Sequence, residues 1–564
     1  MTWFVEMLRA HPELALLATL AAGYSLSKVK LGPLRINTVI AVLLAGLFIG
    51  QLDVDVPAAL QSTLLALFVF AVGYETGPQF FQGLRANGLT QIGLTVVFWL
   101  VALALVLALT AAFDLSPAES AGVFAGGITE SSALGTADGA IGRLEIDPTL
   151  RQQFSTELTV AFAVSYVVGL ASTIWVLSWL GPRLMRIDLA AECRKLEAEL
   201  GVDTTEVGVF SAYRAFVTRA YRIPESLASH TVAALERHFA PQRAFVQRLR
   251  RGSTLGSVEP DTVLAAGDRI ALTTRHESLV SERNPLRATE IDDPELLDIP
   301  SIEVAVLLTR KEFVGRPLAE ISELAGRDVA MRGVFVRKIT RGKQELPRAQ
   351  GTVLERGDVL TLTGAKADIE RLASRIGVVE WPSDSSDLGP VTATIVIGGL
   401  IGLMSVSVGG FQLDLGLAVG VLLGGLLLGW LRSLYPVIGR VTPGGLWMLD
   451  SLGLTGFLAC VALNSAPMFV DGLRESGAMF IASGFVLATV PHMLTILVGR
   501  YVFGIHPGLL LGIVCGAATS APALAAVQQA AQSKVPALAY GVSYAVGNVV
   551  LALSGSIIVT VLAG

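Results

Sequence analysis

Apolar runs about as long as a membrane-spanning helix fill both ends of the chain, and a polar stretch separates them. Because about 20 apolar residues cross the core of a bilayer, the first half predicts spans at about 13–28, 36–50, 58–74, 89–112 and 153–180. A further stretch, 118–142, is apolar but rich in glycine and serine. From about 186 to 387 the pattern is that of a soluble protein. We therefore expect a polytopic α-helical membrane protein with a central α/β domain, 186–387, between membrane regions 1–185 and 388–564.

The same sequence occurs near each end of the chain. Residues 68–88, FVFAVGYETGPQFFQGLRANG, align without a gap with residues 457–477, FLACVALNSAPMFVDGLRESG, and are identical at eight positions. The match continues in order, with 34–52 against 413–431, 122–137 against 512–527, and 163–169 against 541–547. A match that keeps its order indicates a duplication. Duplicated membrane halves are typical of secondary transporters.

Composition supports the membrane assignment. Hydrophobic residues make up 52% of the chain and charged residues 16%, which is typical of an integral membrane protein. The net charge of -5, without a basic patch, excludes a nucleic-acid partner. The charged N-terminus, MTWFVEMLRAHPE, does not fit a cleavable signal peptide. The spacing of Cys193, Cys460 and Cys515 fits neither a disulfide framework nor a metal site, and we expect no metal and no cofactor.

Charged residues between the spans predict the topology. Lys28, Lys30 and Arg35 follow the first span, and the positive-inside rule places their loop in the cytoplasm. The fifth span must also end in the cytoplasm, since Arg183 and the polar domain follow it. Both conditions hold only if 118–142 does not cross completely, so we expect a re-entrant hairpin or broken helix there. Five crossings and a hairpin in each half would make the second repeat inverted relative to the first.

The polar domain contains a second duplication. VLAAGDRIAL (263–272) matches VLERGDVLTL (353–362), and each Gly-Asp pair predicts a tight hairpin turn between two alternating strands. The domain resembles TrkA-C (RCK-C) modules, with tandem copies at about 205–285 and 298–378. It has no GxGxxG fingerprint, so we expect no NAD binding. Whether it binds another ligand or only braces a dimer stays open.

The whole chain resembles the aspartate-alanine exchanger family. GPQFFQGL and TSAPAL are the most specific segments of the resemblance, together with the T-x-x-x-A-L hairpins and the TrkA-C modules. The resemblance implies an antiporter for small amino-acid or dicarboxylate anions in the bacterial inner membrane, whereas the residues alone indicate only a transporter. A sodium-coupled dicarboxylate or inorganic-anion symporter is the alternative, and a ligand-gated channel a weaker one. An enzyme is not expected, because the sequence has no catalytic triad, metal cluster or phosphate loop.

The two hairpins supply the first candidate substrate-binding residues. N-termini of half-helices attract anions, and hydroxyl groups add donors without a permanent charge. Glu130, aligned with Ser520, is a candidate for binding a proton or a substrate ammonium group, and Pro522 is suited to start a half-helix. The alternative is that the hydroxyl residues serve helix packing. The candidates are Thr129, Glu130, Ser131 and Ser132 in one hairpin, and Thr519, Ser520, Ala521 and Pro522 in the other.

Other candidates come from equivalent positions in the two repeats. Tyr166 and Tyr544 are aligned, and Asn548 lies one helical turn after Tyr544. Glu75 and Asn464 are also aligned, each three residues before a proline that could break its helix. The tyrosines either line the site or join helices, whereas a break beside Glu75 and Asn464 would expose backbone carbonyls.

We expect the hairpins to move as a transport unit against a scaffold, in an elevator-like mechanism. The glycine-spaced segments 36–50 and 413–431 suit a scaffold and the contact of a homodimer, since small residues permit close approach. The expected partners are the substrate, membrane lipid and a second copy of the chain.

Overall fold

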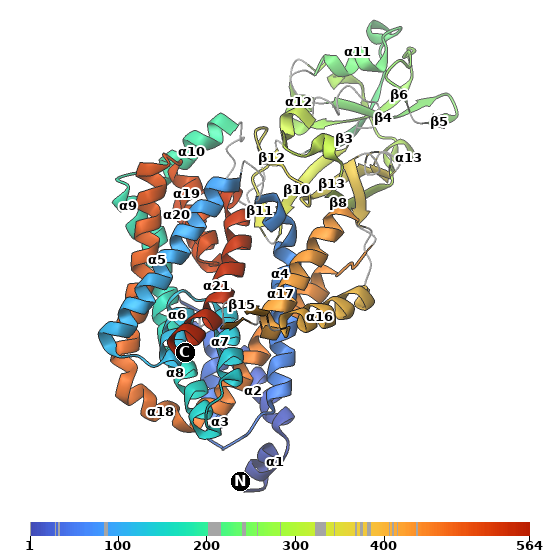
Figure 1. The fold of residues 1–564 in the computed structure, drawn as a ribbon. Coiled ribbons are helices and arrows are strands. Elements are labelled where there is room, and N and C mark those ends of the chain that lie inside the picture. Colours follow the sequence, from blue (N-terminus) through green and yellow to red (C-terminus); the bar gives the residue numbers. More distant parts are fainter. Residues whose placement is uncertain are drawn as a thin grey trace. The chain divides into compact units, whose positions relative to one another are not determined.

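A computed structural model of the chain divides it into two compact units, Met1–Arg194 with Ser383–Gly564, and Lys195–Pro382. It describes residues 2–563 except 29, 32–33, 36, 84–87, 201–215, 240–243, 257, 282–283, 322–333, 343, 367–368, 371, 373–375, 381–384, 405, 409–410, 414–415 and 436–437. The first unit is helical and the second is built on β-sheets (Figure 1). Arg85, one of the eight positions that are identical in the two aligned segments, lies outside the described residues.

The first half of the helical unit follows the predicted order of spans. A short hairpin, β1 (Lys30–Leu31) with β2 (Leu34–Arg35), connects α2 to α3. A π-helical turn, Val176–Leu180, continues α8 into α9 (Gly181–Leu184), and α10 (Leu189–Leu200) follows. The helices that precede the π-helical turn are α1 (Thr2–Ala10), α2 (Pro12–Leu26), α3 (Thr38–Gly50), α4 (Ala58–Gly83), α5 (Leu89–Phe113), α6 (Pro117–Gly127), α7 (Ser131–Arg143) and α8 (Pro148–Trp175).

The second half repeats this order. The hairpin of β15 (Val406–Val408) and β16 (Phe411–Leu413) corresponds to β1 and β2. One continuous helix, α18, takes the place of α4 and α5. The helices are α16 (Leu388–Gly402), α17 (Gly416–Leu434), α18 (Pro443–Leu497), α19 (Pro507–Ala517), α20 (Ala521–Ala531) and α21 (Tyr540–Ala563), with a 3-10 turn at Val535–Ala539 before α21.

Within the described residues, seven helical stretches are long and apolar enough to span a membrane. They are Ala58–Phe81, Leu89–Phe113, Pro148–Leu184, Gly416–Leu434, Pro443–Pro467, Ser476–Val502 and Val535–Ala563. The expected five crossings per half therefore stay a prediction, because they would require shorter apolar helices to cross as well. Helices α2, α3 and α16 have 15, 13 and 15 residues, or about 20 Å each at 1.5 Å per residue, against a hydrocarbon core of about 30 Å.

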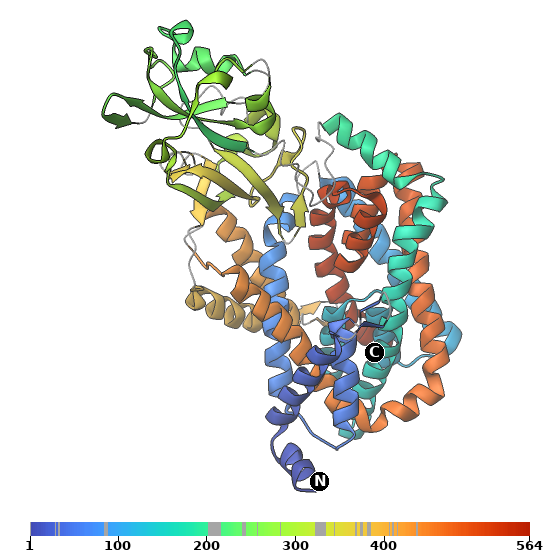
Figure 2. The same ribbon diagram turned by 180° about the vertical axis from the view of Figure 1, so that it is seen from behind.

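The two halves interlock through their small residues. Helix α3 packs on α18, and α4 packs on α17, whose ribbons run side by side (Figure 2). A Cβ added at Gly50 would lie 2.5 Å from the Ala466 Cβ, and one at Gly425 would lie 2.5 Å from the Phe70 carbonyl oxygen. The small residues expected at a dimer contact therefore serve close packing inside one chain.

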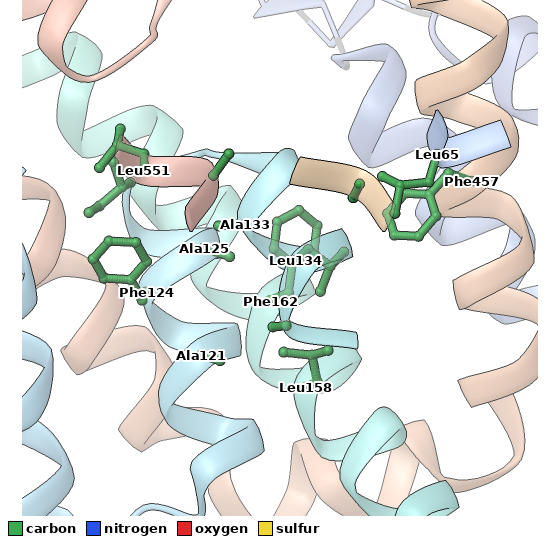
Figure 3. Close-up of a cluster of buried hydrophobic side chains, with 14 of the residues drawn as sticks. Leu65, Ala121, Phe124, Ala125, Ala133, Leu134, Leu158, Phe162, Phe457 and Leu551 are labelled. Carbon is green, nitrogen blue, oxygen red and sulfur yellow. The ribbon is translucent and has the colours of Figure 1, made fainter. Parts of the chain in front are cut away.

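The first pair of short helices is buried in protein. Phe124 and Ala125 of α6 and Leu134 of α7 belong to one cluster with Phe162 of α8 and Leu551 of α21, all fully buried (Figure 3). Non-helical backbone at membrane depth is tolerated only where protein or a water-filled cavity surrounds it. This cluster therefore provides the surroundings that a broken helix needs.

The second unit contains two five-stranded antiparallel sheets of the same topology. Their strand orders are β5-β4-β6-β3-β7 and β11-β10-β13-β8-β14, and both have a register shift at equivalent places, Val246/Arg248 and Val336/Lys338. The strands of the first sheet are β3 (Phe216–Arg222), β4 (Ala244–Arg251), β5 (Thr254–Gly256), β6 (Arg269–Arg275) and β7 (Glu290–Ile291). Those of the second are β8 (Ser301–Leu308), β10 (Phe335–Arg341), β11 (Gln344–Leu346), β13 (Val359–Ala365) and β14 (Gly377–Glu380). The duplication read from the sequence is thus a duplication of the fold.

The Gly-Asp turns have a different role from the predicted one. Strand β12 (Val353–Leu354) pairs with β9 (Arg316–Pro317), and Val263 bridges Thr231. The segments that flank each turn therefore do not pair with each other, and the prediction of a tight hairpin is wrong. In each module the residues before the turn pair with a segment outside the five-stranded sheet, and the residues after it form a strand of that sheet, β6 or β13. Gly267 and Gly357 have φ of +86° and +88°, which explains the glycine.

Each turn is fixed by an equivalent ion pair. Arg251 donates to Asp268 from Nη2 at 2.6 Å, and Arg341 donates to Asp358 from Nε at 2.8 Å. Burial alone would raise the pKa of Asp268, but hydrogen bonds from Arg251 and from the Ala265 N–H outweigh it and lower the pKa below its usual value. The aspartate after each glycine is therefore a structural anchor.

Candidate functional site

The two pairs of short helices, α6–α7 and α19–α20, are broken helices of the kind that the sequence predicted. The breaks lie at equivalent positions, where Thr129 and Thr519 adopt left-handed φ of +62° and +50°. Their backbone bonds are also equivalent, since Thr129 N–H donates to Gly126 O and Thr519 N–H to Gly516 O. The α6–α7 pair lies in the lower part of the helical unit and the α19–α20 pair in the upper part (Figure 1).

Glycines hold each pair against the long helix that follows it. A Cβ at Gly126 would lie 2.5 Å from the Phe162 carbonyl oxygen, and one at Gly516 would lie 2.5 Å from that of Tyr540. The same two glycines adjoin the backbone nitrogens of Tyr166 and Tyr544. The aligned tyrosines are therefore next to the C-terminal ends of α6 and α19, beside the two breaks.

The tips of the two hairpins meet through Glu130. The Thr519 hydroxyl donates to Glu130 Oε2 at 2.7 Å, and Ser132 donates to Oε1 from its N–H at 3.1 Å and its hydroxyl at 2.6 Å. Only 4% of Glu130 is exposed. The carboxylate caps α7, so an acid of the chain itself already occupies the N-terminus of this half-helix.

The N-terminus of α20 carries no such acid. Its cap is the neutral hydroxyl of Ser520, which accepts from Ala523 N–H at 3.4 Å. Residues 507–531 include no Asp, Glu, Lys or Arg. Ser131 and Ala521 begin the two helices, and Pro522 lies in the first turn of α20. The two half-helices therefore have different caps, an acid and a hydroxyl, although they match in backbone.

Tyr540 is a further candidate residue that the sequence did not single out. Its ring stacks on that of Tyr544, with centroids 4.9 Å apart. Within the described residues its hydroxyl is buried and has no hydrogen-bond partner. The alignment of the repeats could have identified it. Tyr540 aligns with Phe162, so the second copy has a hydroxyl group where the first copy has none.

The predicted breaks at Pro78 and Pro467 are not found. Helices α4 and α18 continue through both prolines. Asn464 donates to Val56 O at 3.1 Å and accepts from Val56 N–H at 2.8 Å, and thereby fixes the segment before α4. Asn548 donates to Tyr544 O within its own helix at 2.7 Å. Both side-chain amides thus form hydrogen bonds with backbone groups in this structure.

Asp138 is an acid in the interior of α7, whereas Glu130 caps the N-terminus of that helix. Its two oxygens accept from Gln61 Nε2 of α4 at 2.7 Å and from Ser155 Oγ of α8 at 2.9 Å. It thus joins α7 to two neighbouring helices, and it provides a matched control for Glu130.

Broken helices that meet inside a bundle of apolar helices define a multi-pass membrane transport protein. Residues 15–181 and 390–560 match the family described as Predicted Permease Membrane Region, the Asp-Al_Ex model, and residues 302–377 match the TrkA-C domain. The chain belongs to this permease family, in agreement with its resemblance to aspartate-alanine exchangers. It is a multi-pass protein of the bacterial inner membrane, with the TrkA-C region in the cytoplasm.

Three relatives match along nearly their whole length, and each is named as an uncharacterized transporter. The chain is 38% identical to one from Bradyrhizobium diazoefficiens, over 92% of this chain and 100% of the relative. It is 35% identical to one from Shewanella oneidensis, over 100% of both chains. It is 36% identical to one from Bordetella parapertussis, over 98% and 97%. No solved structure matches the chain. These relatives support a role in transport.

Proposed function

We propose that this transporter exchanges small amino-acid or dicarboxylate anions, and that the substrate binds where the two hairpins meet. The observation that carries the proposal is the hydrogen bond from Thr519 to Glu130, which joins the breaks of both repeats. Broken helices at the interface of repeats are the usual substrate sites of secondary transporters. The positions of the two pairs in Figure 1 support an inverted relation between the repeats, with re-entrant hairpins from opposite sides.

The difference in charge between the hairpins favours a substrate with both signs of charge. The N-terminus of α7 is neutralised by Glu130, so a substrate carboxylate binds more favourably at the start of α20. Glu130 then faces the ammonium group of an amino acid. Plain dicarboxylates would bind only if a proton or a cation compensated the charge of Glu130.

The binding proposal is tested with purified protein. A thermal-shift panel of amino acids and dicarboxylates identifies ligands, because a ligand that binds only the folded state raises its melting temperature. Counterflow in proteoliposomes then shows whether they are transported. We expect stabilisation by at least one small carboxylate and counterflow of the same compound. No stabilisation by any member of the panel would contradict the proposal.

Coupling to sodium is the alternative function that one observation favours. A buried carboxylate such as Glu130 could hold a coupling cation as readily as an ammonium group. Uptake is compared in sodium and in choline buffers, with the protein in sealed proteoliposomes. Exchange that is equal in both buffers supports the antiporter, whereas uptake that requires sodium favours the symporter.

We also propose the elevator-like motion, with α3, α17 and the first part of α18 as scaffold. Thr159 of α8 and Ser465 of α18 lie across this boundary, with their hydroxyl oxygens 2.9 Å apart. The test variant has Thr159→Cys and Ser465→Cys, with the three native cysteines changed to alanine. Oxidation should abolish exchange and a reductant should restore it, while each single cysteine variant stays active. Exchange that persists in the cross-linked protein would exclude the motion.

A homodimer remains our proposal for the assembly. The exposed apolar residues Leu44 and Phe48 of α3 align with Leu423 and Leu427 of α17, which are also exposed. These faces are available to lipid or to a second copy. Mass photometry of the purified protein distinguishes a monomer from a dimer, and a monomer at all concentrations would contradict the proposal.

A further inference from the structure

A hollow of about 720 Å³ adjoins the second hairpin. It lies between the end of α2, the start of α3, helix α8 and the start of α20. Its volume falls within the range of about 300–1,000 Å³ that is usual for small-molecule sites. The lining residues are Ser27, Lys28, Asn37, Thr38, Leu170, Ile174 and Pro522.

The lining of this hollow is suited to an anion. Lys28 is the charged residue among the described residues that line it, and Thr38 adds a hydroxyl. Asn37 caps α3 by accepting from Val39 N–H at 2.8 Å through Oδ1, which leaves its NH₂ group to donate to a ligand. Leu170 and Ile174 supply an apolar wall. A cation and neutral donors beside an apolar wall are the features that bind a small carboxylate.

The hollow adjoins the half-helix that has no acid of its own. Pro522 lies in the first turn of α20, two residues after its cap Ser520 and three after Thr519, which bonds Glu130. Lys28 follows α2, and Asn37 and Thr38 begin α3. Lys28 and the first turn of α20 therefore line the same hollow.

We propose that this hollow binds the second carboxylate of a diacid substrate, with Lys28 as its cation. The inference rests on the proposed function, and it makes Lys28 a residue that determines specificity. Aspartate and succinate have a carboxylate to place in the hollow after the first has bound at α20. Alanine has none, so its binding does not depend on Lys28.

The test compares Lys28→Gln with wild type in the full-length protein, by thermal shift and by counterflow with L-aspartate, succinate and L-alanine as probes. We expect affinity for the two diacids to fall about ten-fold, because a hydrogen bond to a charged group is lost. Affinity for alanine should stay within about two-fold. Lys28→Arg, which keeps the charge, should retain diacid binding, and Lys366→Gln removes one positive charge from the other unit as a control.

A second variant acts without a change of charge. Ile174→Trp narrows the hollow and should also weaken the diacids more than alanine, even if Lys28→Gln folds poorly. Unchanged diacid affinity in the Lys28 variant, or an equal loss for alanine, would overturn this inference alone. No stabilisation of the wild type by any of the three probes would overturn the proposed function as well.

Discussion

The hydroxyl of Thr519 donates a 2.7 Å hydrogen bond to the carboxylate of Glu130, across 389 residues of sequence. Each residue lies at the break of a broken helix, and the two breaks are equivalent in the internal repeat. The bond therefore joins the two repeats at the breaks of both helices. It also gives this point an acidic side chain, since Glu130 has the hydroxyl residue Ser520 as its equivalent in the other repeat.

Removal of the Tyr540 hydroxyl should separate function from stability. Tyr540→Phe abolishes a buried hydroxyl without a hydrogen-bond partner, and such a group costs about 1–3 kcal/mol. We expect an unchanged or higher melting temperature and, at the same time, a slower exchange, because the hydroxyl would donate to the substrate. Ser543→Ala, which removes another buried unpaired hydroxyl of the same helix, is the control. Wild-type exchange in Tyr540→Phe would show that the hydroxyl does not contact the substrate.

The left-handed backbone at Thr129 predicts a gain in stability. A β-branched residue at φ of +62° is strained, and glycine adopts this conformation freely. Thr129→Gly should therefore raise the free energy of unfolding by about 1 kcal/mol. Ala133→Gly, in the interior of α7, should lower it by a similar amount. Melting temperatures of the two variants measure both effects, and a lower melting temperature for Thr129→Gly would refute the assignment of strain.

The Arg251–Asp268 pair predicts a pH dependence in the first module. Because the pKa of folded Asp268 lies below its usual value, its contribution to stability is full above about pH 4 and is lost as the pH falls through the folded pKa. Asp268→Asn should therefore destabilise β6 by about 1 kcal/mol near neutral pH, and the difference from wild type should vanish in acid.

Hydrogen exchange of the β6 amides in the full chain, corrected for intrinsic rates, measures this effect. Asp261→Asn, which changes an exposed acid of the same module, provides the control. A difference between Asp268→Asn and wild type that persists unchanged in acid would contradict the ion-pair account.

The sequence was sufficient to predict the repeats and the positions of both broken helices. Glycine and hydroxyl residues at 126–132 and 516–522 carry that signal, because they mark backbone that turns and packs closely. Helix length was less predictable, since an apolar run does not show where capping residues such as Asn37 begin a helix. Pro78 and Pro467 suggested breaks, but the surrounding helices hold α4 and α18 continuous.

The contacts across the repeats could not be predicted from the sequence. The alignment relates Glu130 to Ser520, its equivalent, whereas the fold joins Glu130 to Thr519. Alignment identifies residues in equivalent surroundings, not residues of one repeat that touch the other repeat. For the same reason the hollow beside Pro522 appeared only when α2, α3, α8 and α20 were assembled.

The most direct test of the central claim is counterflow of L-aspartate and L-alanine in proteoliposomes that contain wild type, Glu130→Gln or Asp138→Asn. Glutamine keeps the size of Glu130 and an oxygen that accepts from Ser132, so the variant should fold. We predict that Glu130→Gln slows exchange at least about ten-fold, whereas Asp138→Asn, which removes a carboxylate from the same helix, stays near the wild-type rate. Wild-type exchange by Glu130→Gln would contradict a substrate site at the meeting point of the hairpins.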